Sequence, residues 1–127
     1  MRPIHPCLPV PGAEQRRLSI AAHWALQHLL DDQPHQLWLD LPASVAVAAE
    51  LAPALSVDVQ RVVERAAVAL VEAYGQAAPT DEVKAACRAF LPCYEAILAT
   101  VTWPRLNEAQ RSTAAAWGDP RASGIRR

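Results

Sequence analysis

The chain has few glycines, few cysteines and no long apolar run. Only 4 of its 127 residues are glycine and these do not cluster, which excludes a glycine-rich phosphate-binding loop. The three cysteines are an odd number, so we expect no closed disulfide framework and a reducing compartment, the cytoplasm. No stretch of about 18 apolar residues occurs, so we expect no transmembrane helix. Prolines interrupt the first residues, so we expect no secretory signal there either.

The sequence also lacks the residue spacings that metal sites and active sites need. No CxxC or HxxxH spacing occurs, although zinc sites commonly use these patterns. No GxSxG or Cys–His signature of a nucleophile appears, and the acidic pairs are adjacent residues whose side chains diverge on a helix. We therefore expect no enzyme, no metal and no cofactor. The net charge of −1 gives no overall field that would attract nucleic acid or an anionic membrane.

Alanine is abundant, with 26 of the 127 residues, and it is the strongest helix former. A hydrophobic content of 52% excludes disorder throughout, and the length fits one domain. The composition therefore predicts an all-α fold, a compact bundle of about five helices. We expect an extended proline-rich arm over residues 1–12, one helical domain over 13–118 and a flexible basic tail over 119–127. Eleven arginines against one lysine indicate a GC-rich, bacterial genome.

Apolar periodicity and helix-end signals place the five helices. They are predicted over residues 13–31, 43–52, 56–74, 80–101 and 104–118. The fourth has the most regular pattern, because its apolar residues step alternately by four and three, as in a coiled coil. We predict that this seam is one buried face of a single helix that bends at Pro92. The seam residues are Val83, Cys87, Phe90, Tyr94, Ile97 and Val101.

The segment 36–41, QLWLDL, interrupts the helical pattern because leucine alternates with other residues. We predict a short extended segment whose three leucines face the core, with Trp38 on the opposite face. Followed by a short and a longer helix, it resembles the strand–helix–helix order of ribbon–helix–helix repressors over residues 36–74. That resemblance implies DNA reading by the outward strand residues. Asp40 opposes this, because a carboxylate in the groove is repelled by the neighbouring phosphates, and no basic residue flanks the strand.

Four tryptophans are many for an alanine- and valine-rich core to enclose, and tryptophan is enriched where proteins bind one another. We predict that Trp38, Trp103 and Trp117 are partner-binding residues. The leading hypothesis is a small non-enzymatic protein that acts through protein–protein contacts, as an adaptor, an inhibitor or a small subunit. Its partner is expected to be another protein, and a homodimer is a further expectation.

Nucleic-acid binding is the alternative, through the ribbon or through Arg61 and Arg65, which share one helical face and could hold phosphates. Asp58, Glu64 and Glu72 interleave with these arginines. That pattern is typical of a solvated face whose charges pair with one another, so we favour the solvated face.

Overall fold

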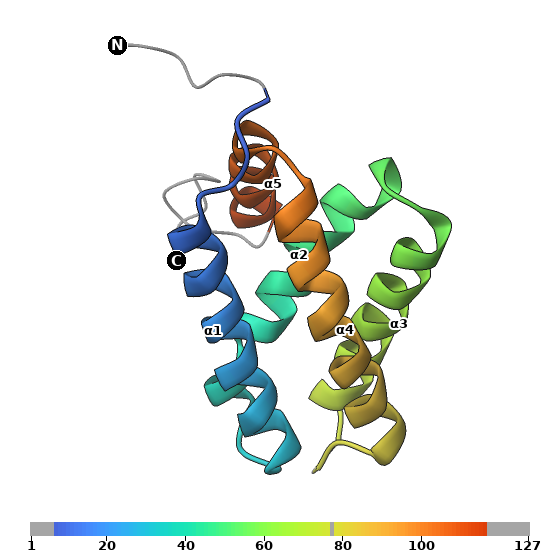
Figure 1. The fold of residues 1–127 in the computed structure, drawn as a ribbon. Helices are drawn as coiled ribbons and strands as arrows, with labels where there is room; N and C mark the ends of the chain where they lie inside the picture. The colour runs from blue at the N-terminus through green and yellow to red at the C-terminus, as the bar shows by residue number, and fades with distance from the viewer. Residues whose placement is uncertain (1–6, 77, 117–127) are drawn as a thin grey trace.

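Five α-helices and two short 3-10 helices make up most of residues 7–76 and 78–116, the part of the chain that the computed structural model describes (Figure 1). The prediction of an all-α bundle of about five helices is confirmed. The α-helices are α1 (Gly12–Leu30), α2 (Asp40–Leu51), α3 (Val57–Tyr74), α4 (Asp81–Thr100) and α5 (Trp103–Ala116). The 3-10 helices are η1 (His35–Trp38) and η2 (Ala52–Ala54).

Helix α4 packs against α1 on one side and α3 on the other, with α2 crossing behind it and α5 lying against α2 (Figure 1). Every residue of the predicted seam is buried, and all but Val101, which follows the last residue of α4, lie in this one helix. The prediction of one long helix with a single core face is confirmed, and the bend at Pro92 stays a prediction. The rings of Phe90 and Tyr94 stack with centroids 5.3 Å apart in this seam. Pro92 lies inside α4 on its exposed side, so the helix continues past a residue that donates no backbone hydrogen bond.

Side-chain caps fix where α3 and α4 begin. Ser56 Oγ accepts a hydrogen bond from the Val59 amide at 3.1 Å, and Thr80 Oγ1 accepts one from the Val83 amide at 3.3 Å. Each hydroxyl satisfies an amide that has no partner within the first turn of its helix. Ser56 and Thr80 are therefore the N-caps of α3 and α4.

A left-handed residue, Asp32, with φ of 58°, follows the C-cap of helix α1. This conformation lets the Gln33 amide donate to the His28 carbonyl at 3.0 Å, as in a Schellman motif. The Asp32 carboxylate also contacts Lys84 Nζ at 2.9 Å. The end of α1 is thereby attached to the start of α4, which orients the outer face of α1.

The predicted extended segment at 36–41 is wrong. Residues 35–38 form η1 and α2 begins at Asp40, so the chain here turns as a helix and its side chains do not alternate. Trp38 is only 2% exposed, and Leu41 is buried on the same side, three residues later. Leu37 and Leu39 are about half exposed instead. The helical period of three to four residues thus places the indole in the core and two leucines outside.

Residues 8–10 lie against the start of α5. The Trp103 amide donates to the Leu8 carbonyl at 2.7 Å, and Pro9 forms an isolated antiparallel bridge with Thr102. Val10 is buried, and its carbonyl accepts a hydrogen bond from Gln15 Nε2 at 2.9 Å.

Within residues 7–76 and 78–116, no helix combines the length and apolarity that a membrane span needs.

Raising the pH above 9 should destabilise the fold through Cys87. Burial raises the pKa of the Cys87 thiol from 9.0 to about 11. The unfolded thiol therefore ionises first, the folded state binds more protons in this window, and the free energy of unfolding falls as pH rises. We expect a loss of about 1–2 kcal/mol between pH 9 and 11, measured by urea unfolding followed by circular dichroism.

Cys87→Ala is the control, because it removes the thiol while Tyr94, whose pKa burial also raises, remains. Its stability should decline less steeply over the same pH range. Parallel declines in the two proteins would show that Cys87 does not cause the effect.

Candidate functional site

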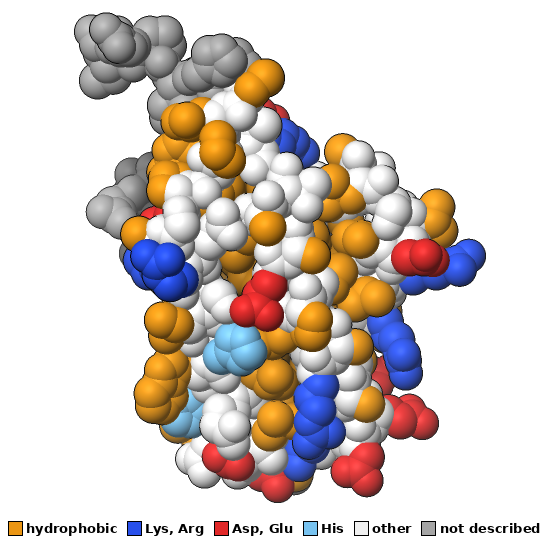
Figure 2. Space-filling model, in the orientation of Figure 1, with side chains coloured by type: hydrophobic (Ala, Val, Ile, Leu, Met, Phe, Trp, Pro, Cys, Tyr) orange, Lys and Arg blue, Asp and Glu red, His pale blue; other side chains and the backbone are white. Residues whose placement is uncertain are grey.

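The outer face of α1 carries two large apolar side chains in solvent. Trp24 is 65% exposed and Ile20, one turn earlier, is 56% exposed. They face away from the core because the opposite side of the helix supplies Ala22, Ala25, Leu26 and Leu29 to it. Hydrophobic side chains accordingly line the α1 edge of the molecule in Figure 2. We call Ile20, Trp24 and the two hollows beside them the α1 surface.

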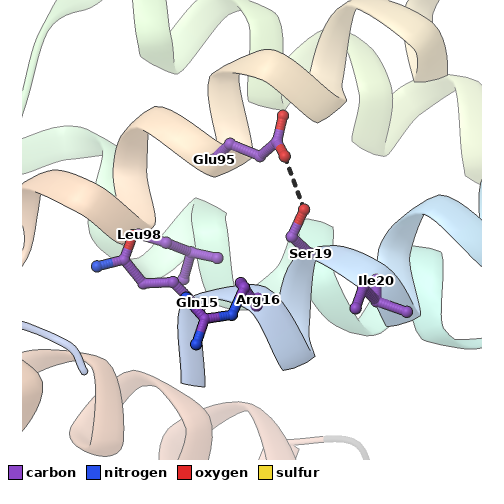
Figure 3. Close-up of a pocket in the computed structure, with 6 residues that line it drawn as sticks. All are labelled: Gln15, Arg16, Ser19, Ile20, Glu95 and Leu98. Carbon is purple, nitrogen blue, oxygen red and sulfur yellow. Dashed lines mark hydrogen bonds between the residues drawn. The ribbon is translucent and has the colours of Figure 1, made fainter. Parts of the chain in front are cut away.

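Ile20 forms a ridge between the two hollows. The first, of about 310 Å³, lies between α1 and α4 and is lined by Gln15, Arg16, Ser19, Ile20, Glu95 and Leu98 (Figure 3). The second, of about 380 Å³, is shallower and is lined by Ile20, His23, Trp24 and Gln27. The α1 surface thus has an apolar ridge with a recess on each side, and polar as well as apolar side chains line the first recess.

One carboxylate organises the polar part of this surface. Ser19 Oγ donates to Glu95 Oε2 at 2.7 Å, and His23 Nε2 lies 3.5 Å from the same oxygen. An activated serine needs the imidazole between the hydroxyl and the carboxylate. Here the Glu95 carboxylate lies between the Ser19 hydroxyl and the His23 imidazole, and it accepts a hydrogen bond from that hydroxyl. Glu95 therefore accepts both contacts, and the exposed Arg16 side chain lines the same recess.

Trp38 does not lie at the surface, so the prediction that its indole faces a partner is wrong. Its Nε1 donates to the Gln33 carbonyl at 3.1 Å. Its ring lies 5.3 Å from that of Tyr74 and 6.3 Å from that of His35, centroid to centroid. Partial burial in this cluster raises the pKa of Tyr74. The indole is a packing element that joins η1 to the end of α3.

The other two predicted contact residues have different positions. Trp103 is half-buried against the core at the start of α5. Trp117 lies outside the described residues. Trp24 is not among the predicted contact residues, yet it is the most exposed tryptophan in the described part of the chain. The signal was its helical position, because Trp24 lies off the stripe of Leu18, Ala22, Ala25 and Leu29 that faces inward.

Arg61 and Arg65 are both exposed on α3. None of the ion pairs among residues 7–76 and 78–116 includes either of them, so the predicted pairing with the interleaved acids does not form. A hollow of about 220 Å³ between α3 and α4 is lined by Arg65, Glu72 and Glu82 together with Val68, Ala69, Val83 and Ala86. Charges of both signs therefore share this face.

The ribbon of a ribbon–helix–helix protein is missing from residues 36–74, because their first turn is helical.

Helix α3 carries a second exposed apolar group, which we call the α3 surface. It consists of Val57, Val68, Val71 and Tyr74. Val71 and Tyr74 also line an apolar groove of about 220 Å³ between α2 and α3, in which no lining residue is charged.

Within residues 7–76 and 78–116, no cluster of three or more histidines, cysteines and acidic residues could hold a metal ion.

No protein-family model, no curated protein and no solved structure matches this chain.

Proposed function

We propose that this chain is a non-enzymatic protein that works by binding another protein through the α1 surface. The observation that supports this most is the pairing of Trp24 and Ile20, two large apolar side chains one turn apart and more than half exposed. Burial of apolar surface stabilises a complex by about 25 cal/mol for each square ångström removed from water. A partner that covers this ridge would recover that free energy. The odd cysteine count favours the cytoplasm as the compartment.

The composition of the α1 surface favours a protein partner over a small ligand. Its apolar residues form a ridge that projects between two open recesses, whereas small-ligand sites enclose most of their ligand. Glu95, Arg16 and His23 supply polar groups around the ridge, as at the rim of a protein interface. The expected partner presents an apolar pocket that accepts the indole of Trp24. It also presents hydrogen-bonding groups to the Arg16 guanidinium and the Glu95 carboxylate.

Trp24→Ala should weaken partner binding by about 2 kcal/mol, roughly a 30-fold rise in Kd, because it removes the central apolar anchor. The partner is first captured from a native lysate with the wild-type chain and then titrated by calorimetry. Val71→Ala is the matched control, since Val71 is 74% exposed but lies on α3. Its Kd should stay within about twofold of the wild-type value. Equal affinities of wild-type and Trp24→Ala chains would contradict the proposed site.

The nucleic-acid alternative makes a different prediction, which the same purified proteins can test. Exposed Arg61 and Arg65, without ion-pair partners among the described residues, would bind phosphates with an affinity that falls steeply with salt. A gel shift with DNA or RNA at about 50 mM salt that Arg61→Ala and Arg65→Ala abolish would favour this alternative. The absence of any shift would remove it.

A further inference from the structure

We propose that the partner of the α1 surface is a second copy of this chain. The two α1 helices then lie antiparallel, with a two-fold axis crossing between His23 and Trp24. This inference rests on the proposed function, because it names the partner of the same surface. The apolar contacts and the ion pairs of the arrangement all come from one face of one helix.

The exposed residues on the outer face of α1 form a single stripe. They are, in chain order, Arg16, Ile20, Trp24, Gln27 and Asp31. They follow one another by steps of four, four, three and four residues, and such steps place side chains above one another on an α-helix. The stripe lies opposite the buried residues Ala22, Ala25 and Leu29, so it faces away from the core. Apolar and charged side chains therefore share the surface that a partner would cover.

The apolar part of the stripe is symmetric about the proposed axis. The hollow of about 380 Å³ is lined by Ile20, His23, Trp24 and Gln27, which form two pairs equidistant from the midpoint between His23 and Trp24. Reversing the helix about that midpoint therefore places one hollow over the other. The two Trp24 side chains then lie almost level with each other on the same side of the contact. Each indole packs against the other and against Ile20 of the second copy, which buries the exposed apolar surface of both.

Charges of opposite sign lie at the two ends of the same stripe. Arg16 and Asp31 are equidistant from the midpoint and about 22 Å apart along the helix. Antiparallel pairing places Arg16 level with Asp31 of the second copy, at both ends of the contact. Neither residue has an ion pair within residues 7–76 and 78–116. The Asp31 carboxylate accepts hydrogen bonds from Gln27 Nε2, both at 3.1 Å, and these hold it on the outer face.

The charges favour the antiparallel arrangement over the parallel one. In a parallel pair, Arg16 would lie beside Arg16 of the second copy and Asp31 beside Asp31, which is repulsive. In the antiparallel pair, the neighbouring charged residues meet neutral ones, since Arg17 lies level with Leu30 of the second copy. Arg17 also keeps its own ion pair with Glu14. The stripe is thus complementary to a reversed copy of itself, with an apolar centre between two reciprocal ion pairs.

Sedimentation equilibrium of the purified full chain, from about 1 µM to about 1 mM, tests the pairing. We expect the mass to rise with concentration from 13.8 kDa towards twice that value. Trp24→Ala removes the apolar centre, and Arg16→Glu and Asp31→Arg each bring like charges together at both ends. Each of these variants should dimerise at least about tenfold more weakly than the wild type. Arg61→Glu is the matched control and should dimerise like the wild type, because it makes the same charge change on α3.

Mixing the two charge variants distinguishes reciprocal pairing from a general loss of folding. Opposite charges meet at both ends when Arg16→Glu in one chain binds Asp31→Arg in the other, so the mixture should form a heterodimer although each variant alone is monomeric. The double variant Arg16→Glu/Asp31→Arg should dimerise like the wild type for the same reason. Single variants that dimerise normally, or a mixture that stays monomeric, would overturn the pairing.

The wild-type mass separates this inference from the proposed function. A mass that stays at 13.8 kDa would overturn self-pairing. If Trp24→Ala still weakened the capture of a different protein, the proposed function would hold with that protein as the partner. If neither self-association nor capture depended on Trp24, both proposals would be contradicted.

Discussion

Trp38→Ala should lower the free energy of unfolding by about 3–5 kcal/mol, the range for deleting a buried indole. The side chain is almost fully enclosed, and its removal leaves a cavity between η1 and the end of α3, beside the Tyr74 ring. It also leaves the Gln33 carbonyl without its indole donor. Such a loss is a large share of the stability of a domain this size, so the variant should unfold at a much lower urea concentration.

Two further variants make the Trp38 experiment specific. Trp38→Phe keeps an aromatic ring against Tyr74 but removes the hydrogen bond to Gln33, and it should cost less than Trp38→Ala. Trp24→Ala deletes the same type of side chain from the surface and should change the free energy of unfolding by less than about 0.5 kcal/mol. Equal effects of Trp38→Ala and Trp24→Ala would show that Trp38 does not belong to the core.

Pro92→Ala should raise the free energy of unfolding by about 1–2 kcal/mol. Proline in a helix interior is about 3 kcal/mol less favourable than alanine, because it lacks an amide donor and its ring crowds the preceding turn. Part of that gain is offset, since alanine gives the unfolded chain more conformational freedom than proline does. Pro92 is exposed, so the smaller side chain leaves no cavity. Urea unfolding measures the shift.

Pro104→Ala provides the comparison for Pro92. Pro104 is the second residue of α5, where a helix has no acceptor for the amide and proline is tolerated. Its replacement should leave the free energy of unfolding nearly unchanged. If Pro92→Ala instead destabilised the protein, α4 would require proline at this position for its contacts with α1 and α3.

The spacing of apolar residues predicts the helices well where it fits only a helical period. It predicts them poorly where it fits both a helical period and the two-residue period of a strand. In α4 the steps of four and three match only a helix, and its five seam residues are buried, as is Val101 directly after the helix. In 36–41, leucine occurs at every second residue, but Trp38, Leu41, Pro42 and Val45 also follow a helical period. Burial of the larger indole, with its donor satisfied by Gln33, favours the helical arrangement. The number and spacing of the apolar residues alone do not show that the helical arrangement is preferred.

The candidate site was only partly accessible to sequence arguments. The tryptophan content predicts an exposed indole, and the stripe of α1 could have indicated Trp24 as that residue. The cluster of Ser19, His23 and Glu95 could not be predicted, because it depends on α1 and α4 packing in one particular register. Neither Arg65 nor Glu72 forms an ion pair in the described part of the chain, and this too depends on side-chain conformations that spacing alone does not determine.

The contact between the Leu8 carbonyl and the Trp103 amide also bears on the order of folding events. Nearly the whole described chain separates these two groups, so joining them closes a very large loop and costs correspondingly more entropy than a local contact. We therefore expect the helices between them to pack before the two groups meet. Contacts that form after the transition state slow unfolding without speeding folding. We therefore expect residues 8–10 to slow the unfolding of the packed bundle without speeding its folding.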